Sequence, residues 1–226
     1  MKPGILRTLL AAAILSGTHG LAAAAPEIQA IALPAPRTEG GMALMQALKA
    51  RKTTRDISAE KLPLAVLSDL LWAGFGVNRP EIDHRTAPSA MNSQEIDIYV
   101  ALAEGLYVYE AKPHRLRPVL ADDLRLKTSS QPFVTNAPVA LIFVADYSRM
   151  PKAKPEDRDS YAAIDTGFIS QNIYLFCASA DLATVVHDLD RRRLAEAMNL
   201  RPDQRIVIAQ AVGYPKPPTP NTGSAK

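Results

Sequence analysis

The sequence predicts an α+β fold, in which helices and strands fall into separate runs instead of alternating regularly. Two helical patterns come first, strand patterns cluster in the middle of the chain, and a long helical pattern separates the last strand from the others. With 226 residues, 47% of them hydrophobic, the chain can bury a core large enough for one compact domain.

The first two elements are predicted to be helices. Leu44 and Leu48 recur at helical spacing in a stretch that runs to Lys49, and a second apolar stripe follows Pro63. The stripe consists of Leu64, Leu67, Leu70 and Leu71.

Three strands are predicted next. In the stretch 95–102, apolar residues alternate with Glu95, Asp97 and Tyr99, so we expect one face of this strand in the core. The residues 106–109 after Gly105 resemble the second arm of a hairpin, and the nearly continuous apolar run 138–145 is typical of a central strand. The alternating apolar residues are Ile96, Ile98, Val100 and Leu102.

The last third of the chain is expected to contain two helices and a final strand. Residues 149–159 are polar and carry two prolines, which predicts a loop, and helical spacing then extends over 162–180. Residues 191–199 predict a short helix, and residues 205–212 form a strand-like run.

The chain is expected to begin with a secretory signal at residues 1–25. Lys2 and Arg7 precede a short apolar run, and small residues reach Ala25, where cleavage is expected. A buried N-terminal helix is the alternative interpretation. Prolines and glycines predict a linker or arm over 26–41, a domain over 42–216 and a flexible tail over 217–226. Export predicts a periplasmic protein without a stable membrane anchor.

Composition excludes some partners and cross-links. The net charge of +3 comes from 26 basic and 23 acidic residues spread along the chain, so no basic block suggests a nucleic-acid partner. The single cysteine, Cys177, cannot form an intramolecular disulfide, and its apolar neighbours predict an inert core thiol.

The segment Arg51-Lys52-Thr53-Thr54-Arg55 is the first candidate site. It follows the first predicted helix and places three cations and two hydroxyls within five residues. A guanidinium group can donate two parallel hydrogen bonds to phosphate oxygens, and the threonine hydroxyls can donate further ones. The segment can therefore surround a phosphate. A solvated basic turn is the alternative interpretation.

Residues 85–94 form the second candidate site, a polar segment immediately before the first predicted strand. Its small residues would let the backbone approach a flat ligand, and Asn92 can both donate and accept hydrogen bonds along the edge of a heterocycle. Taken alone, the segment is only a loop.

Three other classes of site are not supported. A serine hydrolase would need a nucleophile elbow and a serine paired with His84, His114 or His187, and the sequence has neither. The histidines also lack neighbours at metal-ligand spacing, and the glycine fingerprint of a dinucleotide-binding domain is absent.

Together and in this order, the motifs resemble the nitroreductase superfamily of flavoenzymes. The likeness is strongest to the branch with the azoline-oxidising dehydrogenases of peptide maturation, the SagB- and ThcOx-type enzymes. The motifs that carry it are residues 51–55, Leu70-Leu71-Trp72-Ala73-Gly74-Phe75-Gly76, Arg85 to Asn92, 95–100, 105–109, 165–175 and Val212-Gly213-Tyr214-Pro215.

The resemblance implies a central, mostly antiparallel sheet flanked by helices, and a homodimer with FMN at its interface. Arg51 matches the arginine that meets the flavin phosphate, with help from Lys52 and Thr53. Arg55 matches the basic residue at the pyrimidine edge of the isoalloxazine, where a cation stabilises the negative charge of the reduced ring.

The resemblance also assigns a second half of the site to the partner subunit. Pro88, Ser89, Ala90 and Asn92 match the segment that the partner lays against the flavin. The chain departs from the family in two places: Asp181-Leu182-Ala183-Thr184 replaces a glycine-rich run near flavin N5, and only Lys216 follows the final Gly-Tyr-Pro. Thr184, Val185 and Lys216 complete the expected cofactor-binding set.

The function implied is oxidation or reduction of a small organic substrate through bound FMN. A nitroaromatic, a quinone and an azoline-like compound all remain open as substrates, and the electron donor is open because NAD(P)H is scarce outside the cytoplasm. The alternative is an exported flavin-binding or assembly protein that keeps the fold without turnover.

Overall fold

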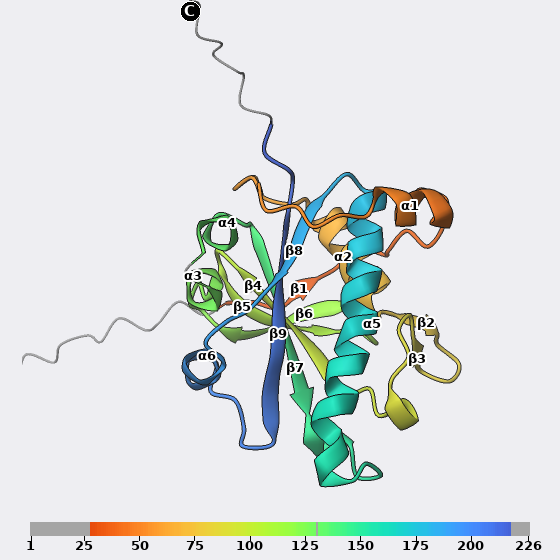
Figure 1. The fold of residues 1–226 in the computed structure, drawn as a ribbon, viewed down its shortest axis with the longest axis vertical. Coiled ribbons are helices and arrows are strands. Elements are labelled where there is room, and N and C mark those ends of the chain that lie inside the picture. The colour runs from red at the N-terminus through yellow and green to blue at the C-terminus, as the bar shows by residue number, and fades with distance from the viewer. Residues whose placement is uncertain (1–27, 130, 218–226) are drawn as a thin grey trace, which may run out of the picture.

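The computed structural model describes residues 28–129 and 131–217, and its core is a seven-stranded sheet (Figure 1). Every neighbouring pair of strands is antiparallel, which confirms the predicted α+β class. In spatial order the strands are β1 (Ile31–Ala32), β6 (Arg115–Leu120), β5 (Gly105–Glu110), β4 (Ile96–Leu102), β7 (Val139–Asp146), β9 (Gln204–Gly213) and β8 (Ala183–His187).

The predicted hairpin joins β4 to β5, with Leu102 opposite Gly105. Gly105 has a φ of +151°, and a Cβ atom there would lie 2.5 Å from the carbonyl oxygen of Leu120. Only glycine satisfies both conditions, which explains the position of the turn.

Strands β4 and β7 lie in the middle of the sheet and are buried on both faces. All eight residues of β7 are buried, as expected of a central strand. The expectation that only one face of β4 lies in the core is wrong, because Glu95 and Tyr99 are buried too. A second hydrophobic cluster covers that face, and the alternating pattern did not reveal it.

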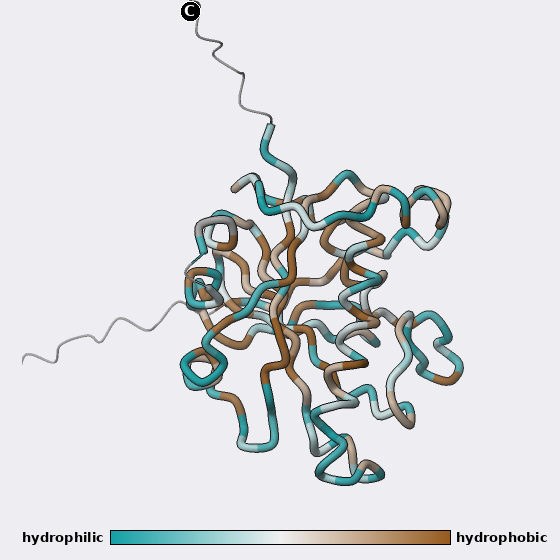
Figure 2. Tube along the Cα trace, viewed as in Figure 1, coloured by the Kyte–Doolittle hydropathy of each residue, from teal (hydrophilic) through white to brown (hydrophobic). Residues whose placement is uncertain are grey.

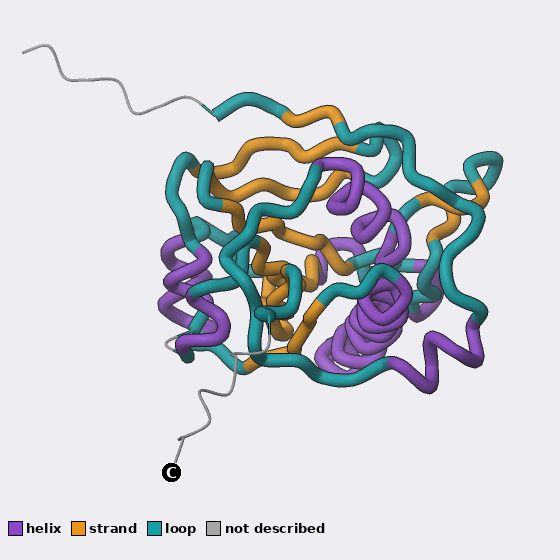
Figure 3. The backbone as a smooth tube through the Cα atoms, turned by 90° about the horizontal axis from the view of Figure 1, so that it is seen from above, coloured by secondary structure: helices purple, strands orange, loops and turns teal. Residues whose placement is uncertain are grey.

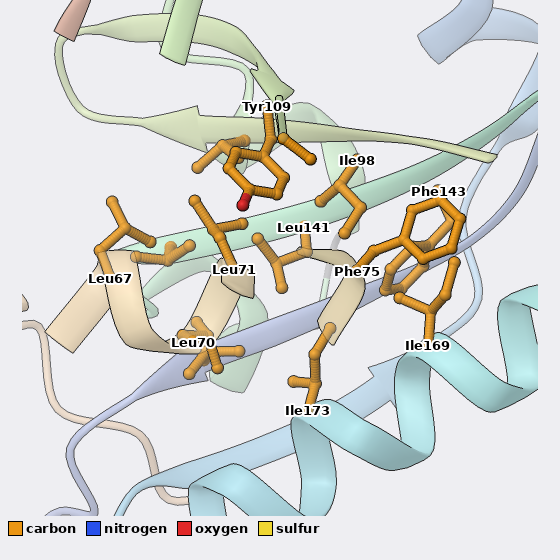
Figure 4. Close-up of a cluster of buried hydrophobic side chains, with 14 of the residues drawn as sticks. Leu67, Leu70, Leu71, Phe75, Ile98, Tyr109, Leu141, Phe143, Ile169 and Ile173 are labelled. Atoms are coloured by element: carbon orange, nitrogen blue, oxygen red, sulfur yellow. The ribbon is translucent and has the colours of Figure 1, made fainter. Parts of the chain in front are cut away.

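Helices pack on both faces of the sheet (Figure 3). Helices α2 and α5 cover one face and α6 covers the other, and Figure 4 shows Leu70, Phe75 and Ile173 meeting between α2, α5 and the sheet. The helices are α1 (Leu44–Ala50), α2 (Leu64–Phe75), α3 (Arg125–Thr128), α4 (Pro132–Thr135), α5 (Arg158–Ser179) and α6 (Arg191–Ala197), with short 3-10 turns η1 (Ala90–Asn92), η2 (Tyr147–Arg149) and η3 (Pro155–Asp157).

The described part of the expected N-terminal linker is packed against the domain. Strand β1 pairs with β6, and Leu33 enters the main core. Arg37 donates from its backbone N–H and from Nε to the buried carboxylate of Asp69 at 2.8 and 2.7 Å. The expectation of an unpacked segment is therefore wrong for these residues, because α2 offers polar partners along its length.

Several short elements were not predicted. Strands β1, β6 and β8 are among them, as is a small two-stranded sheet of β2 (Val77–Arg79) and β3 (His84–Arg85). The expected signal segment and all but Pro217 of the expected tail lie outside the described residues. Among the helices that the structure describes, none is long and apolar enough to span a bilayer.

Hydrophobic residues concentrate in the central strands, while the surface loops are mostly hydrophilic (Figure 2). Helix α1 departs from this pattern, because Leu44, Met45 and Leu48 are exposed and only Ala47 is buried. The outer side of α5 likewise exposes Ile164 and Phe168, which lie one turn apart.

Candidate functional site

The basic segment begins where helix α1 ends. Arg51 is the C-terminal cap, and its N–H donates to the carbonyl oxygen of Ala47 at 2.8 Å. The chain then runs along β8, where the Thr54 N–H donates to the Thr184 carbonyl at 3.0 Å. These bonds fix both ends of the stretch 51–54.

The end of strand β9 brings Lys216 to the same segment. The Lys216 N–H donates to the Asp56 carbonyl at 2.8 Å, and Ile57 forms a bridge with Pro215. Gly213 permits this close approach, because a Cβ atom there would lie 2.7 Å from Ile57 Cγ2.

Tyr174 of α5 organises the basic segment, a role that only its place in a family motif could have suggested. The Arg51 guanidinium carbon lies 5.4 Å from the centre of the Tyr174 ring, a cation–π distance. The Tyr174 hydroxyl lies 3.3 Å from Thr53 Oγ1 and accepts a hydrogen bond from the Val186 N–H at 3.0 Å. Tyr174 thus connects Arg51 and Thr53 to strand β8.

The positive charges of this segment have little local compensation. Within residues 28–129 and 131–217, no carboxylate forms an ion pair with Arg51, Lys52 or Lys216. Arg55 is exposed on the same loop. The cluster of Arg51, Lys52 and Lys216, beside the Thr53 hydroxyl, fits the charge and donor requirements of a phosphate group.

Thr184 and Val185 reach this region with their backbone only. Both side chains are buried, and Thr184 Oγ1 donates to the Ala211 carbonyl at 2.9 Å while it accepts from Gln210 Nε2 at 3.0 Å. Any contact with a ligand would therefore come from backbone groups. Cys177 is buried close by, and desolvation raises the pKa of its thiol, as expected of an unreactive core cysteine.

The second predicted segment forms a tight turn against α5. The Ala90 N–H donates to Asp165 Oδ2 at 2.7 Å, and the Gln94 N–H donates to Ser89 Oγ at 2.9 Å. Pro88 and Asn92 are exposed. The turn is therefore anchored from inside and open to solvent on its outer side.

The backbone of this turn is strained. Met91 and Asn92 have φ angles of 53° and 54°, and Gln94 has one of 47°. Non-glycine residues in this region cost free energy, and such residues cluster at functional sites. The strain persists because the surrounding hydrogen bonds fix the turn.

The structure does not bring the two predicted segments together within one chain. The first contacts α5 at Tyr174 and the second contacts it at Asp165, nine residues away, which corresponds to roughly 14 Å along the helix axis. Figure 1 shows the loop after α1 at one end of α5 and the β2–β3 region beside its other half.

A polar cavity of about 460 Å³ lies beside the second segment. Three of the basic side chains that line it are paired: Arg149 with Asp97 at 2.8 Å, Arg117 with Glu110 at 2.8 Å and Lys112 with Asp83 at 3.6 Å. Arg85 also lines the cavity, and no ion pair joins it to a carboxylate of the described residues. The electrostatics of the cavity therefore differ from those of the basic segment. Across the described residues, no group of three or more His, Cys, Asp or Glu side chains could hold a metal ion.

Comparisons with known proteins identify the family of the chain. The model of the nitroreductase family, described by that name, matches residues 48–214 and so spans both segments. A protein of Methanocaldococcus jannaschii that is named as a nitroreductase is 31% identical over 145 residues, which are 60% of this chain and 73% of that protein.

Solved structures show the same fold. A Ralstonia eutropha JMP134 protein, also named as a nitroreductase, is 44% identical with a TM-score of 0.80, over 84% of this chain and 90% of that one. A chain of the E. coli microcin synthetase complex is 17% identical with a TM-score of 0.64, over 93% of this chain and 85% of that one, a likeness of fold alone. The family model, the sequence relative and the fold agree: the chain belongs to the nitroreductase family.

Proposed function

We propose that the protein is an FMN-dependent oxidoreductase that works as a homodimer with the flavin at its interface. Membership of the nitroreductase family supports an oxidoreductase. The observation that carries the choice of cofactor is the cluster of Arg51, Lys52 and Lys216, which has no carboxylate partner among the described residues.

Each residue of the cluster has a separate role in this proposal. Arg51 and Lys216 would bind the phosphate oxygens, with Lys52 and the Thr53 hydroxyl adding donors. Tyr174 would hold Arg51 and Thr53 in place, as it does in the structure. Arg55 would face the pyrimidine edge of the ring and stabilise negative charge there. Bound FMN would supply the capacity to accept and donate a hydride or single electrons.

FMN is favoured over FAD because the segment offers one cationic cluster for one phosphate. In the other cation-rich region, beside the polar cavity, Arg149, Arg117 and Lys112 are already paired with Asp97, Glu110 and Asp83. A second phosphate and an adenine would need a further binding region, and neither predicted segment supplies one.

A shared site is favoured because the two segments lie apart on one chain. The partner subunit's Pro88, Ser89, Ala90 and Asn92 would cover the flavin that Arg51 and Arg55 hold. The outer faces of Pro88 and Asn92 are exposed and so remain available for such a contact. Exposed apolar residues on α1 and α5, among them Met45 and Phe168, supply a surface for association.

The substrate in this proposal is a small organic molecule, with a nitroaromatic, a quinone or an azoline-like compound as the candidate classes. The motif order favours the SagB- and ThcOx-type branch. The N-terminal sequence supports export to the periplasm, and the electron donor stays open because NAD(P)H is scarce outside the cytoplasm.

Purification followed by an absorbance scan and chromatography of the released cofactor tests the proposal. We expect FMN to be released on denaturation. Release of FAD, or a colourless protein that does not take up added FMN, would refute the assignment. Anaerobic titration with NADH, NADPH and a reduced quinone then separates an enzyme, whose flavin is reduced by a donor and reoxidised by a substrate, from a flavin carrier without turnover.

A further inference from the structure

Glu95 is a buried acid without a hydrogen-bond donor. It precedes strand β4 and directly follows the strained turn, and its side chain is fully buried. In the part of the chain that the structure describes, neither carboxyl oxygen receives a hydrogen bond from an N–H or O–H group. A buried carboxylate in such a setting is unfavourable, because its charge is neither hydrated nor bonded.

The neighbour of Glu95 is a second buried carboxyl group, Asp165 of α5. Asp165 is 3% exposed, and its Oδ2 accepts the Ala90 N–H at 2.7 Å. Two carboxylates repel each other at contact, whereas one shared proton makes the same contact a hydrogen bond. Burial, the charge of Asp165 and the hydrogen bond with it raise the pKa of Glu95 to about 7, although its own backbone N–H and the charge of Arg149 act to lower it.

The other charged and titratable groups around Glu95 do not neutralise it. Arg149 donates from Nη2 to the backbone carbonyl of Glu95 at 2.8 Å, and it is also paired with Asp97 and Asp146. Tyr147 lies close enough for the charge of Glu95 to raise its pKa, but its hydroxyl is bonded to Asp159. A proton held between Glu95 and Asp165 would supply the hydrogen bond that the Glu95 carboxyl oxygens lack.

We propose that Glu95 and Asp165 share one proton and act together as a positioning pair for the turn 88–92, so that loss of this proton loosens the turn and weakens flavin binding by the dimer. The link to flavin rests on the proposed function, because that function assigns the turn to the partner's cofactor.

The geometry explains how one proton would control the turn. Asp165 anchors the turn at Ala90, immediately before the strained residues Met91 and Asn92. When Glu95 loses its proton to solvent, the repulsion between the two carboxylates pushes Asp165 away from Glu95 and strains the bond to Ala90. The turn then loses the contact that holds its left-handed residues in place.

Two substitutions test the pair in the full-length dimer. Glu95→Gln keeps the shape and supplies an amide donor to Asp165 at every pH. Asp165→Asn reverses the roles, because its amide can donate to Glu95 while its oxygen still accepts from Ala90. Glu196→Gln is the matched control, since Glu196 is exposed on α6.

The first measurement follows carboxyl and amide chemical shifts by NMR against pH, without flavin. We expect one glutamate carboxyl to titrate near neutrality in the wild type and in Glu196→Gln, with the Ala90 amide shift following the same midpoint. In Glu95→Gln, the glutamate titration near neutrality and the pH-dependent shift of the Ala90 amide should both be absent. In Asp165→Asn, the midpoint of the Glu95 titration should move toward the ordinary glutamate range. If Glu95 titrates in that range in the wild type, the pair does not share a proton and the inference is wrong.

The second measurement is the FMN dissociation constant from pH 6 to 8.5. Over this pH range, the increase in the dissociation constant should be about tenfold larger in the wild type than in Glu95→Gln. A tenfold difference corresponds to about one unit between the pKa of Glu95 in the free protein and its pKa in the FMN-bound protein. Comparison with the variant removes the titration of the FMN phosphate. Equal pH dependence in both proteins would overturn the positioning role. If the NMR result holds but no protein binds FMN at any pH, the proposed function fails while the shared proton stands.

Discussion

At the scale of single residues, Arg51 has the most specific proposed role, which is to bind the phosphate of FMN. Its guanidinium lies over Tyr174 and has no carboxylate partner among the described residues, so it can bind an anion without first breaking an ion pair. We predict that Arg51→Ala weakens FMN binding by about 1.5–3 kcal/mol, the scale of a charge-assisted hydrogen bond. Titration of the flavin-free protein with FMN measures this loss.

The matched control for Arg51 is Arg192→Ala. Arg192 is 83% exposed on α6 and lies 4.0 Å from Glu196, so its removal also takes one positive charge from the protein. FMN affinity should be unchanged in this variant. An equal loss in both variants would show that the effect comes from net charge and not from a phosphate contact.

The hydrogen bonds of His114 predict how the free energy of unfolding depends on pH. Its Nδ1 lies 2.9 Å from the Tyr109 hydroxyl and its Nε2 lies 2.7 Å from Ser68 Oγ. Because the Ser68 hydroxyl donates to the Pro34 carbonyl, we assign the ring proton to Nε2 and the acceptor role to Nδ1. This chain of bonds needs a neutral ring, because Nδ1 is an acceptor in it. Burial accordingly lowers the pKa of His114.

The sign of this effect follows from the lowered pKa. The unfolded chain binds a proton near pH 6.5 and the native His114 binds one only at lower pH, so stability falls as the pH drops through this window. We predict that the free energy of unfolding in urea decreases less between pH 7 and pH 5 in His114→Gln than in the wild type. His84→Gln is the control and should keep the wild-type difference. Equal pH dependence in all three proteins would contradict the assigned tautomer.

At the scale of elements, the periodicity of the sequence predicts those that pack one clear face. Helix α2 has this form and is confirmed, and the hairpin of β4 and β5 and strand β7 are confirmed as elements although β4 and β7 are buried on both faces. Strand β6 was missed because Arg115, Arg117 and Pro118 interrupt its apolar pattern. It lies near the sheet edge, where such residues are tolerated, and only pairing with β5 and β1 makes it a strand.

In the candidate site, too, some residues are recognisable from local sequence and others only from tertiary contacts. Charge density alone marked residues 51–55, since a cluster of cations stands out in any sequence. The roles of Tyr174, Glu95 and Asp165 depend on tertiary contacts, and none of these residues has an unusual local pattern. Alternation places Glu95 on an outer strand face, because it cannot show that Glu95 lies beside Asp165 of α5 and is fully buried there.

The docking of the loop 51–58 onto β9 leads to a prediction for Gly213. An added Cβ would lie 2.6 Å from Pro138 Cδ as well as against Ile57, and both neighbours are rigid. We predict that Gly213→Ala lowers the free energy of unfolding by about 1–3 kcal/mol, the usual cost of overpacking. FMN affinity should fall too, because the loop carries Arg51 and Lys52. Unchanged stability in urea would mean that the loop is not held as closely as the structure shows.

At the scale of the whole molecule, the exposed apolar residues of α1 and α5 mark the expected dimer surface. Met45 is 75% exposed and Phe168 is 45% exposed, which is unfavourable for side chains of this size in a monomer. We predict that Phe168→Asp shifts the protein from dimer to monomer in analytical ultracentrifugation. Leu126→Asp is the control, because Leu126 is 61% exposed on α3, and it should leave the dimer intact. A dimeric Phe168→Asp protein would place the interface elsewhere.

Mixing two inactive parents tests the shared flavin site most directly. One parent carries Arg51→Ala and Arg55→Ala, and the other carries Ser89→Ala and Asn92→Ala. If each site takes one segment from each subunit, a heterodimer has one site with all four substitutions and one site with none. We predict that the heterodimers regain FMN binding and turnover at about half the wild-type level. If mass measurement shows heterodimers and neither activity returns, both segments act within one chain and the shared site is wrong.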